Sequence, residues 1–184
     1  MDQAADTGKQ FDEVIGLCHK TFMSKMGDYG SAWRILRTPS ITDQIYIKAN
    51  RIRSIEEKGT QKVDEGIRPE YIGIINYSIM ALIQLELGPD HPLNLEVEQA
   101  DSRYLKFAAE ARSLMMDKNH DYGEAWRNMR RSSLTDIILM KLMRIKQIED
   151  HSGKTFVSEG VEANYYDIIN YAVFSLIKME YENN

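Results

Sequence analysis

An internal repeat constrains the fold of this chain more than any other feature of its sequence. The peptide Asp-Tyr-Gly-x-Ala-Trp-Arg occurs twice, displaced by 93 positions. Without gaps, residues 25–58 match 118–151 at 17 of 34 positions, and after one inserted residue 65–86 match 159–180 at 10 of 22. Agreement over so many positions indicates that one unit has been duplicated.

The repeat divides the chain into two copies joined by a short linker. We expect copy 1 over residues 1–90 and copy 2 over residues 91–184, packed as one compact body. The segment 88–92 contains two prolines within four residues, which stop a helix and mark the linker. No segment shows sustained alternation with a period of two, so strands are not expected.

Each copy is predicted to be helical, and the pattern is clearest in copy 2. Gly123 is expected to end the first helix in a left-handed conformation, and Ser133 or Thr135 to cap the next one. The helical segments of copy 2 are predicted near 95–119, 124–130, 134–150 and 163–181. A single copy could hardly bury both of its very apolar helices. The predicted fold is therefore all-α, a tandem duplicated helical unit packed as a pseudo-dimeric helical bundle.

Charge and composition exclude several functional classes. The net charge is −5, divided as −2 over residues 1–92 and −3 over 93–184, so no broad nucleic-acid-binding surface is expected. No stretch approaches the roughly 18 consecutive apolar residues of a membrane span. The single cysteine, Cys18, cannot form an internal disulfide, and the polar start does not resemble a secretory signal. We therefore expect a cytoplasmic protein.

Polar side chains interrupt two apolar helices of copy 2. Lys141 and Arg144 are three residues apart in one helix, and Asp167 and Asn170 are three apart in the other. This spacing places each pair on one helical face. Because charged groups are rarely buried without a partner, the two faces are expected to meet or to line a polar pocket.

Internal ion pairing would explain these residues without any ligand, but a comparison with the sequence of copy 1 favours the ligand interpretation. Copy 1 keeps the equivalent cations, Lys48 and Arg51, and has Gly73 where copy 2 has its aspartate. Two costly buried charges would then need another anion. Glu56, Glu65 or a bound phosphate could supply it.

Acidic and aromatic residues suggest further contacts. Glu159, Asp167 and Glu149 could converge as oxygen ligands for Mg²⁺, although Glu149 is equally compatible with a helix surface. Tyr122 could stack on a base. Five arginines belong either to a solvated face or to a phosphate site: Arg127, Arg130, Arg131 and, in copy 1, Arg34 and Arg37.

The order of motifs resembles a known family. The chain is similar to the nucleotide-modification-associated domain family, first class, in three successive motifs. These are Lys-x-x-Asp-Tyr-Gly-x-x-Trp, then Lys-x-x-Arg-Ile, then Glu followed eight residues later by Asp and eleven later by Asn-Tyr. That family in turn resembles MazG-type all-α nucleoside triphosphate pyrophosphohydrolases. The matching residues are Lys118, Asp121, Tyr122, Gly123, Trp126, Lys141, Arg144, Glu159, Asp167 and Asn170, and in copy 1 Lys25, Asp28, Tyr29, Gly30, Trp33, Lys48, Arg51, Glu65 and Asn76.

The resemblance implies a nucleotide-binding protein that cleaves a nucleoside triphosphate with Mg²⁺. Glu159 and Asp167 would hold the metal as catalytic residues, with Glu149 as a further ligand. The residues implied in binding the nucleotide or deoxynucleotide are Lys141, Arg144, Asn170, Arg127, Tyr122, Lys48, Arg51 and Asn76. Two alternatives stay open: a non-catalytic nucleotide or modified-base sensor, and a helical scaffold without ligand. The preferred base and any association into a homo-oligomer also stay open.

Overall fold

The helical pattern of the sequence is realised throughout the computed structural model, which describes residues 6–59, 66–155 and 159–182. These residues form six α-helices and two short 3₁₀ helices and contain no strand, so the all-α prediction is confirmed. None of these helices is long and apolar enough to cross a membrane. The elements of copy 1 are α1 (Thr7–Tyr29), η1 (Ala32–Ile35), α2 (Thr38–Lys58) and α3 (Ile67–Leu87), and those of copy 2 are α4 (Val97–Tyr122), η2 (Ala125–Asn128), α5 (Arg131–Asp150) and α6 (Val161–Tyr181).

Four of the six α-helices in the described residues end at a glycine with positive φ. Gly123 ends α4 with a φ of +62°, a conformation that glycine adopts without the steric cost of a Cβ atom. The predicted cap of the next helix is wrong. Helix α5 begins at Arg131, before Ser133 and Thr135, and no side chain caps it. Thr135 is buried and has other hydrogen-bond partners, described below.

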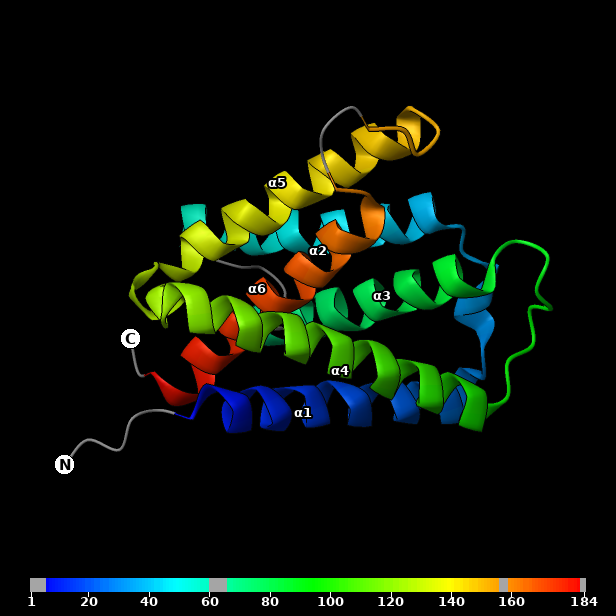
Figure 1. Ribbon diagram of the computed structural model, residues 1–184, viewed down its shortest axis with the longest axis horizontal. Coiled ribbons are helices and arrows are strands. Elements are labelled where there is room, and N and C mark those ends of the chain that lie inside the picture. Colours follow the sequence, from blue (N-terminus) through cyan, green and yellow to red (C-terminus); the bar gives the residue numbers. More distant parts are fainter. Residues whose placement is uncertain (1–5, 60–65, 156–158, 183–184) are drawn as a thin grey trace.

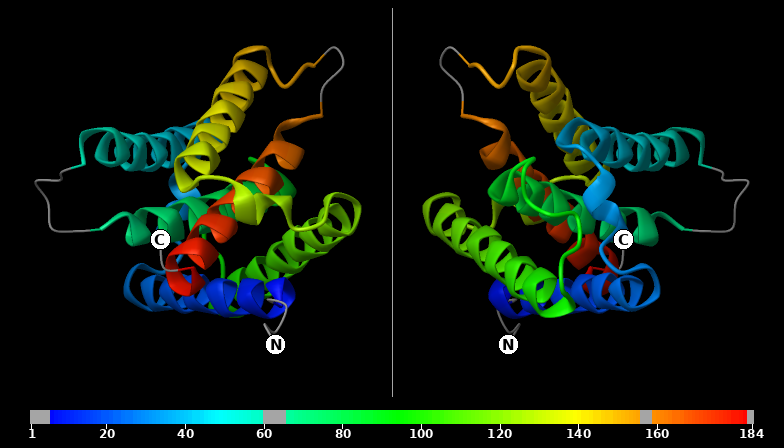
Figure 2. Two further views of the ribbon diagram at one scale, coloured as in Figure 1. Left: turned by 90° about the vertical axis from the view of Figure 1, so that its left-hand side faces the viewer. Right: turned by 90° about the vertical axis from the view of Figure 1, so that its right-hand side faces the viewer.

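The two copies interlock in three layers, each made of one helix from each copy (Figure 1). Helix α1 packs against α4, α3 against α6, and α2 against α5. The α3/α6 layer lies between the other two (Figure 2). Because α3 and α6 are apolar on nearly every face, neither copy could bury its central helix alone. The predicted duplicated, pseudo-dimeric bundle is therefore the observed architecture.

The linker between the copies is held by side chains of copy 1. The Arg34 guanidinium donates to the carbonyl oxygens of His91, at 3.2 Å, and Pro92, at 3.1 Å. The Ser31 hydroxyl accepts from the backbone N–H of Leu95 at 3.0 Å. The boundary predicted at residue 90 falls in this segment between α3 and α4.

Candidate functional site

Asp167 lies at the centre of an ion-pair cluster in copy 2. Its Oδ1 accepts from Lys118 Nζ of α4 at 2.7 Å, and its Oδ2 lies 2.8 Å from Lys141 Nζ of α5. The sequence indicated Lys141 as a partner; Lys118 entered only as a motif residue. Each oxygen of this buried carboxylate is thus engaged by one ammonium group.

The cluster carries a net positive charge. Burial lowers the pKa of Lys118, but the hydrogen bond and the charge of Asp167 outweigh it, and the charges of Tyr171 and Glu159 add to this effect. The pKa of Lys118 is therefore raised, and the group stays protonated at neutral pH. Among the three ion-paired groups, two ammonium groups face one carboxylate, which favours an anionic ligand, while the exposed Glu159 carboxylate offsets part of this charge.

A cavity of about 370 Å³ lies beside this cluster, between α4, η2 and α6. This volume suits a small organic ligand. The Trp126 ring in its wall stacks on Phe174, with ring centroids 4.2 Å apart and planes 4° from parallel. Tyr122, which is 76% exposed, lies at its edge. The other lining residues are Met115, Lys118, Gly123, Ala125, Met129, Asp167, Asn170 and Tyr171.

Two buried polar atoms of the cavity wall have no partner within the described residues. The Asn170 side chain is 5% exposed and donates from Nδ2 to the Ala111 carbonyl at 3.1 Å, which leaves Oδ1 as an acceptor without a donor. Trp126 is also 5% exposed, and its Nε1–H has no acceptor. An unsatisfied buried group costs about 1–3 kcal/mol. A ligand offering one donor and one acceptor would remove both penalties.

The equivalent asparagine of copy 1 is fully satisfied. Asn76 Nδ2 donates to the Cys18 carbonyl at 3.0 Å, and Asn76 Oδ1 accepts from the Tyr104 hydroxyl at 2.7 Å. Tyr104 belongs to α4, so the second bond crosses from copy 2 to copy 1. Its repeat equivalent, 93 positions earlier, is Phe11, which has no hydroxyl. This exchange explains why the asparagine oxygen is satisfied in copy 1 and left free in copy 2.

The tryptophans differ in the same way. In copy 1, Trp33 Nε1 donates to Met26 Sδ at 3.3 Å. The repeat equivalent of Met26 is Asn119, whose Nδ2 donates instead to Met115 Sδ at 3.3 Å. Trp126 therefore lacks the acceptor that Trp33 has. The cavity of copy 1, about 390 Å³, has Lys48 and the satisfied Asn76 in its wall, and Trp33, which does not line it, is satisfied too.

Within the described residues, both copy 1 cations, Lys48 and Arg51, pair with Glu70, which the sequence analysis did not consider. Its carboxylate lies 3.6 Å from Lys48 Nζ and 3.0 Å from Arg51 Nη1. Gly73 makes this possible, because a Cβ atom there would lie 2.8 Å from the Lys48 stem. Neither Glu56 nor a bound phosphate is needed, and Glu65 lies outside the described residues.

Glu149 and its equivalent Glu56 lie at the interface between the copies. Thr135 donates to Glu56 Oε1 at 2.9 Å and is hydrogen-bonded to the Tyr71 hydroxyl at 2.9 Å. The corresponding chain of the other copy consists of Glu149, Thr42 and Tyr165, with the two hydroxyl groups 2.5 Å apart. Each chain therefore joins residues of both copies.

The predicted magnesium trio is not assembled. Glu149 hydrogen-bonds Thr42 at the copy interface, and Glu159 is exposed just before α6. Across the parts of the chain that the structure describes, no group of three or more His, Cys, Asp or Glu side chains could hold a metal ion. Spacing along the sequence could not show that α5 turns Glu149 towards the other copy.

The interface glutamates predict a pH dependence. Burial raises the pKa of Glu56 and of Glu149 above 4.5, and the hydrogen bonds from Thr135 and Thr42 lower it only in part. The folded state therefore favours the protonated form of both glutamates. The stability gained in this way is full below the unfolded-state pKa and is lost as the pH rises through the raised folded-state pKa. The Glu56→Gln/Glu149→Gln variant should be more stable than the wild type at pH 7, and this advantage should vanish near pH 4 in urea unfolding. An advantage that stays constant with pH would contradict this assignment.

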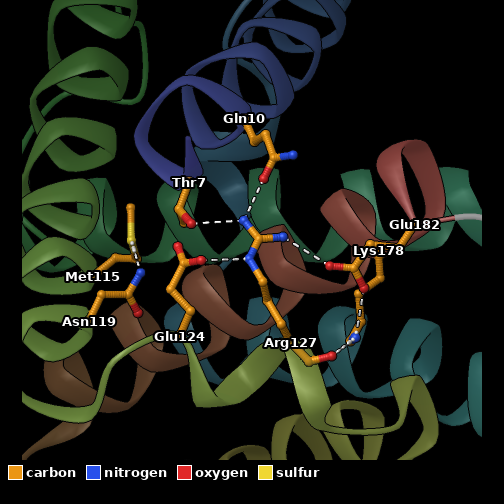
Figure 3. Close-up of polar contacts among 8 residues, drawn as sticks. All are labelled: Thr7, Gln10, Met115, Asn119, Glu124, Arg127, Lys178 and Glu182. Atoms are coloured by element: carbon orange, nitrogen blue, oxygen red, sulfur yellow. Dashed lines mark hydrogen bonds and ion pairs between the residues drawn. The ribbon is translucent and has the colours of Figure 1, made fainter. Parts of the chain in front are cut away.

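Two predicted phosphate ligands lie away from the cavity. Arg127 is the centre of a hydrogen-bonded hub: it donates to Glu124 at 2.8 Å, Glu182 at 2.9 Å, Thr7 at 2.8 Å and Gln10 at 2.6 Å (Figure 3). It lies neither on a solvated face nor free for a ligand. Arg144 is exposed and does not line the cavity.

Fold and site define a class of protein: a duplicated all-α bundle whose two copies differ in how the polar side chains beside their cavities are satisfied. The chain belongs to the nucleotide modification associated domain 1 family, whose sequence profile matches it twice, over residues 25–85 and 118–179. The comparison with curated proteins and the comparison with solved structures each found no match.

Proposed function

We propose that copy 2 binds a nucleotide, with the base in the cavity of copy 2. The observation that carries the proposal is the pair of buried atoms without partners, the Asn170 Oδ1 acceptor and the Trp126 Nε1 donor. A nucleobase presents donors and acceptors along its edges and apolar faces to aromatic and methionine walls. The family to which the chain belongs is named for an association with nucleotide modification, which agrees with this ligand class.

The surplus positive charge beside the cavity supports a phosphorylated ligand. Lys118 lines the cavity and its side chain is half-exposed, so its ammonium group can turn towards a phosphate while Lys141 keeps its ion pair with Asp167. Less than 1 Å² of each unpartnered atom is exposed. A ligand would therefore reach them after exposed side chains at the edge, Tyr122 and Lys118, move aside.

The arrangement favours binding without turnover over the magnesium-dependent hydrolysis that the resemblance implied. Both oxygens of Asp167 are engaged by ammonium groups, and Glu149 lies at the copy interface. Hydrolysis between the α and β phosphates would need a metal or a base to activate water. Among the predicted ligands, Glu159 alone keeps an exposed carboxylate near the cluster.

Thermal unfolding with a panel of nucleoside and deoxynucleoside mono- and triphosphates tests the proposal, each measured in EDTA and in Mg²⁺. A ligand at one hundred times its dissociation constant should stabilise the protein by about 2.7 kcal/mol. We expect a selective shift that persists in EDTA, and no pyrophosphate in the same mixtures. Absence of a shift with every nucleotide would reject binding. A shift that requires Mg²⁺, together with pyrophosphate in the same mixture, would favour the hydrolysis hypothesis instead.

Phe11→Tyr should weaken nucleotide binding about tenfold, equivalent to about 1.4 kcal/mol. The new hydroxyl would donate to Asn170 Oδ1 as the Tyr104 hydroxyl donates to Asn76 Oδ1, so the ligand would lose its acceptor. Isothermal titration calorimetry of the best nucleotide measures the change. The matched control, Tyr104→Phe, removes the hydrogen bond to Asn76 of copy 1 and should leave the affinity unchanged. Equal affinity of wild type and Phe11→Tyr would remove Asn170 Oδ1 from the site.

A further inference from the structure

Copy 1 contains a buried guanidinium group without a carboxylate partner in the described part of the chain. Arg34, in η1, is 4% exposed. Its hydrogen bonds go to the Gln84 side-chain oxygen, to His91 and to the Pro92 carbonyl, and its Nε has no partner. A guanidinium group stays charged at neutral pH, and burying such a charge without an anion is costly.

The repeat equivalent of Arg34 shows what is missing. Arg127 donates from Nε to Glu124 and from Nη1 to Glu182 (Figure 3). Hydrogen bonds from Lys178 and Arg127 outweigh the effect of burial and lower the pKa of Glu182, so this carboxylate is ionised. The positions equivalent to Glu124 and Glu182 in copy 1 are Ser31 and Gly88, which bring no charge.

A cavity lies where the second carboxylate is absent. Its volume is about 510 Å³, and it extends to the first residues of α2. Helix α2 has no acidic residue in its first turn and no side-chain cap, so its positive dipole end is not neutralised by either, although Pro39 contributes no N–H group. The residues of its wall that matter here are Arg34, Arg37, Thr38, Gln84, Gly88 and His91.

The electrostatic surroundings of Arg34 are positive. Burial lowers its pKa, and the nearby charge of Arg103 lowers it further. The Nε atom of Arg103 is also buried without a partner within the described residues. Arg37 brings a second guanidinium group to the cavity wall. Two guanidinium groups, the unsatisfied Nε donor of Arg34 and a helix N-terminus thus coincide at one cavity, with Arg103 as a further nearby charge.

We propose that this cavity binds a phosphate group, with Arg34 and Arg37 as its ligands and the N-terminus of α2 beside it. Two guanidinium groups and a helix N-terminus match a phosphate dianion better than a singly charged carboxylate. The group comes either from inorganic phosphate or from a small phosphate ester. This site uses residues of copy 1 and does not depend on the cavity of copy 2.

Ser31→Glu tests the site by supplying the carboxylate that Arg127 has in Glu124. Glu124 adopts nearly the same backbone conformation as Ser31, so the backbone accommodates glutamate, while the hydrogen bond from the Leu95 N–H to the Ser31 hydroxyl is lost in both Ser31→Glu and its control Ser31→Gln. Titration calorimetry with inorganic phosphate, in sodium chloride of matched ionic strength, should show at least tenfold weaker binding than in the wild type. Ser31→Gln has the same size without the charge and should bind like the wild type. Arg37→Ala, at an exposed position, should weaken binding at least fivefold.

The outcomes separate the possibilities. The site is supported if the wild type binds inorganic phosphate and both Ser31→Glu and Arg37→Ala weaken this binding. It is also supported if the wild type binds glycerol 3-phosphate but not inorganic phosphate, which would identify an ester as the source. No binding of either compound to the wild type, or binding that neither variant changes, would overturn the proposal. Phe11→Tyr should leave phosphate binding unchanged, so failure here is distinct from failure of nucleotide binding in copy 2.

Discussion

Replacing Asp167 by asparagine is expected to lower the free energy of unfolding by about 3 kcal/mol. The change removes the negative charge that Lys118 and Lys141 share, while the amide keeps the shape of the carboxylate. In this variant Lys141, which is largely buried, cannot recover full hydration, whereas the half-exposed Lys118 can. The loss of stability is therefore expected at the lower end of the range for buried ion pairs. Urea unfolding at pH 7 measures the difference.

A second variant tests whether the unpaired charge causes the loss. Lys141→Met removes the buried ammonium group, so the double variant with Asp167→Asn should be more stable than Asp167→Asn alone. A single variant that loses less than about 1 kcal/mol would show that the carboxylate is not a structural ion-pair partner. It would return Asp167 to the set of residues available for a ligand.

Arg127→Met should also cost about 3 kcal/mol and should loosen both ends of the described chain. The guanidinium group joins the first turns of α1, through Thr7 and Gln10, to Glu182 beyond α6 (Figure 3). Its removal leaves Glu182 with Lys178 as its remaining cation and frees the start of α1. Native-state hydrogen exchange should show faster exchange in residues 7–11 and 178–182 than in α3.

Arg144→Met serves as the matched control for this variant. Arg144 is exposed and forms no ion pair within residues 6–59, 66–155 and 159–182, so its replacement should change stability by less than about 0.5 kcal/mol. Unchanged exchange at both chain ends in Arg127→Met would contradict the role of the hub.

The fold could be predicted because its signals are local or repeated. The duplication gave the architecture, and the very apolar α3 and α6 required partners from the other copy. Polar residues three apart correctly indicated that Lys141 and Asp167 face each other. These inferences need only helical periodicity and the cost of burying charge.

The details of the site depend on which helix meets which, and the sequence does not contain that information locally. In copy 1 the carboxylate comes from Glu70, one turn before Gly73, the position equivalent to Asp167. This replacement becomes visible only because the Lys48 side chain passes across Gly73. The bond from Tyr104 to Asn76 crosses between copies. Alignment of the two copies shows that Tyr104 corresponds to Phe11. Only the packing of α3 against α4 shows that the Tyr104 hydroxyl reaches Asn76.

That exchange has a consequence for how such a protein can change. In a symmetric homodimer, every substitution is introduced twice, so a tyrosine that satisfies one asparagine satisfies both. Joining the two units in one chain removes this coupling. Phe11 and Tyr104 can then differ, so that the Tyr104 hydroxyl satisfies Asn76 while Asn170 keeps an unsatisfied acceptor. In a single chain, a substitution at one position thus acts on one half of the molecule alone.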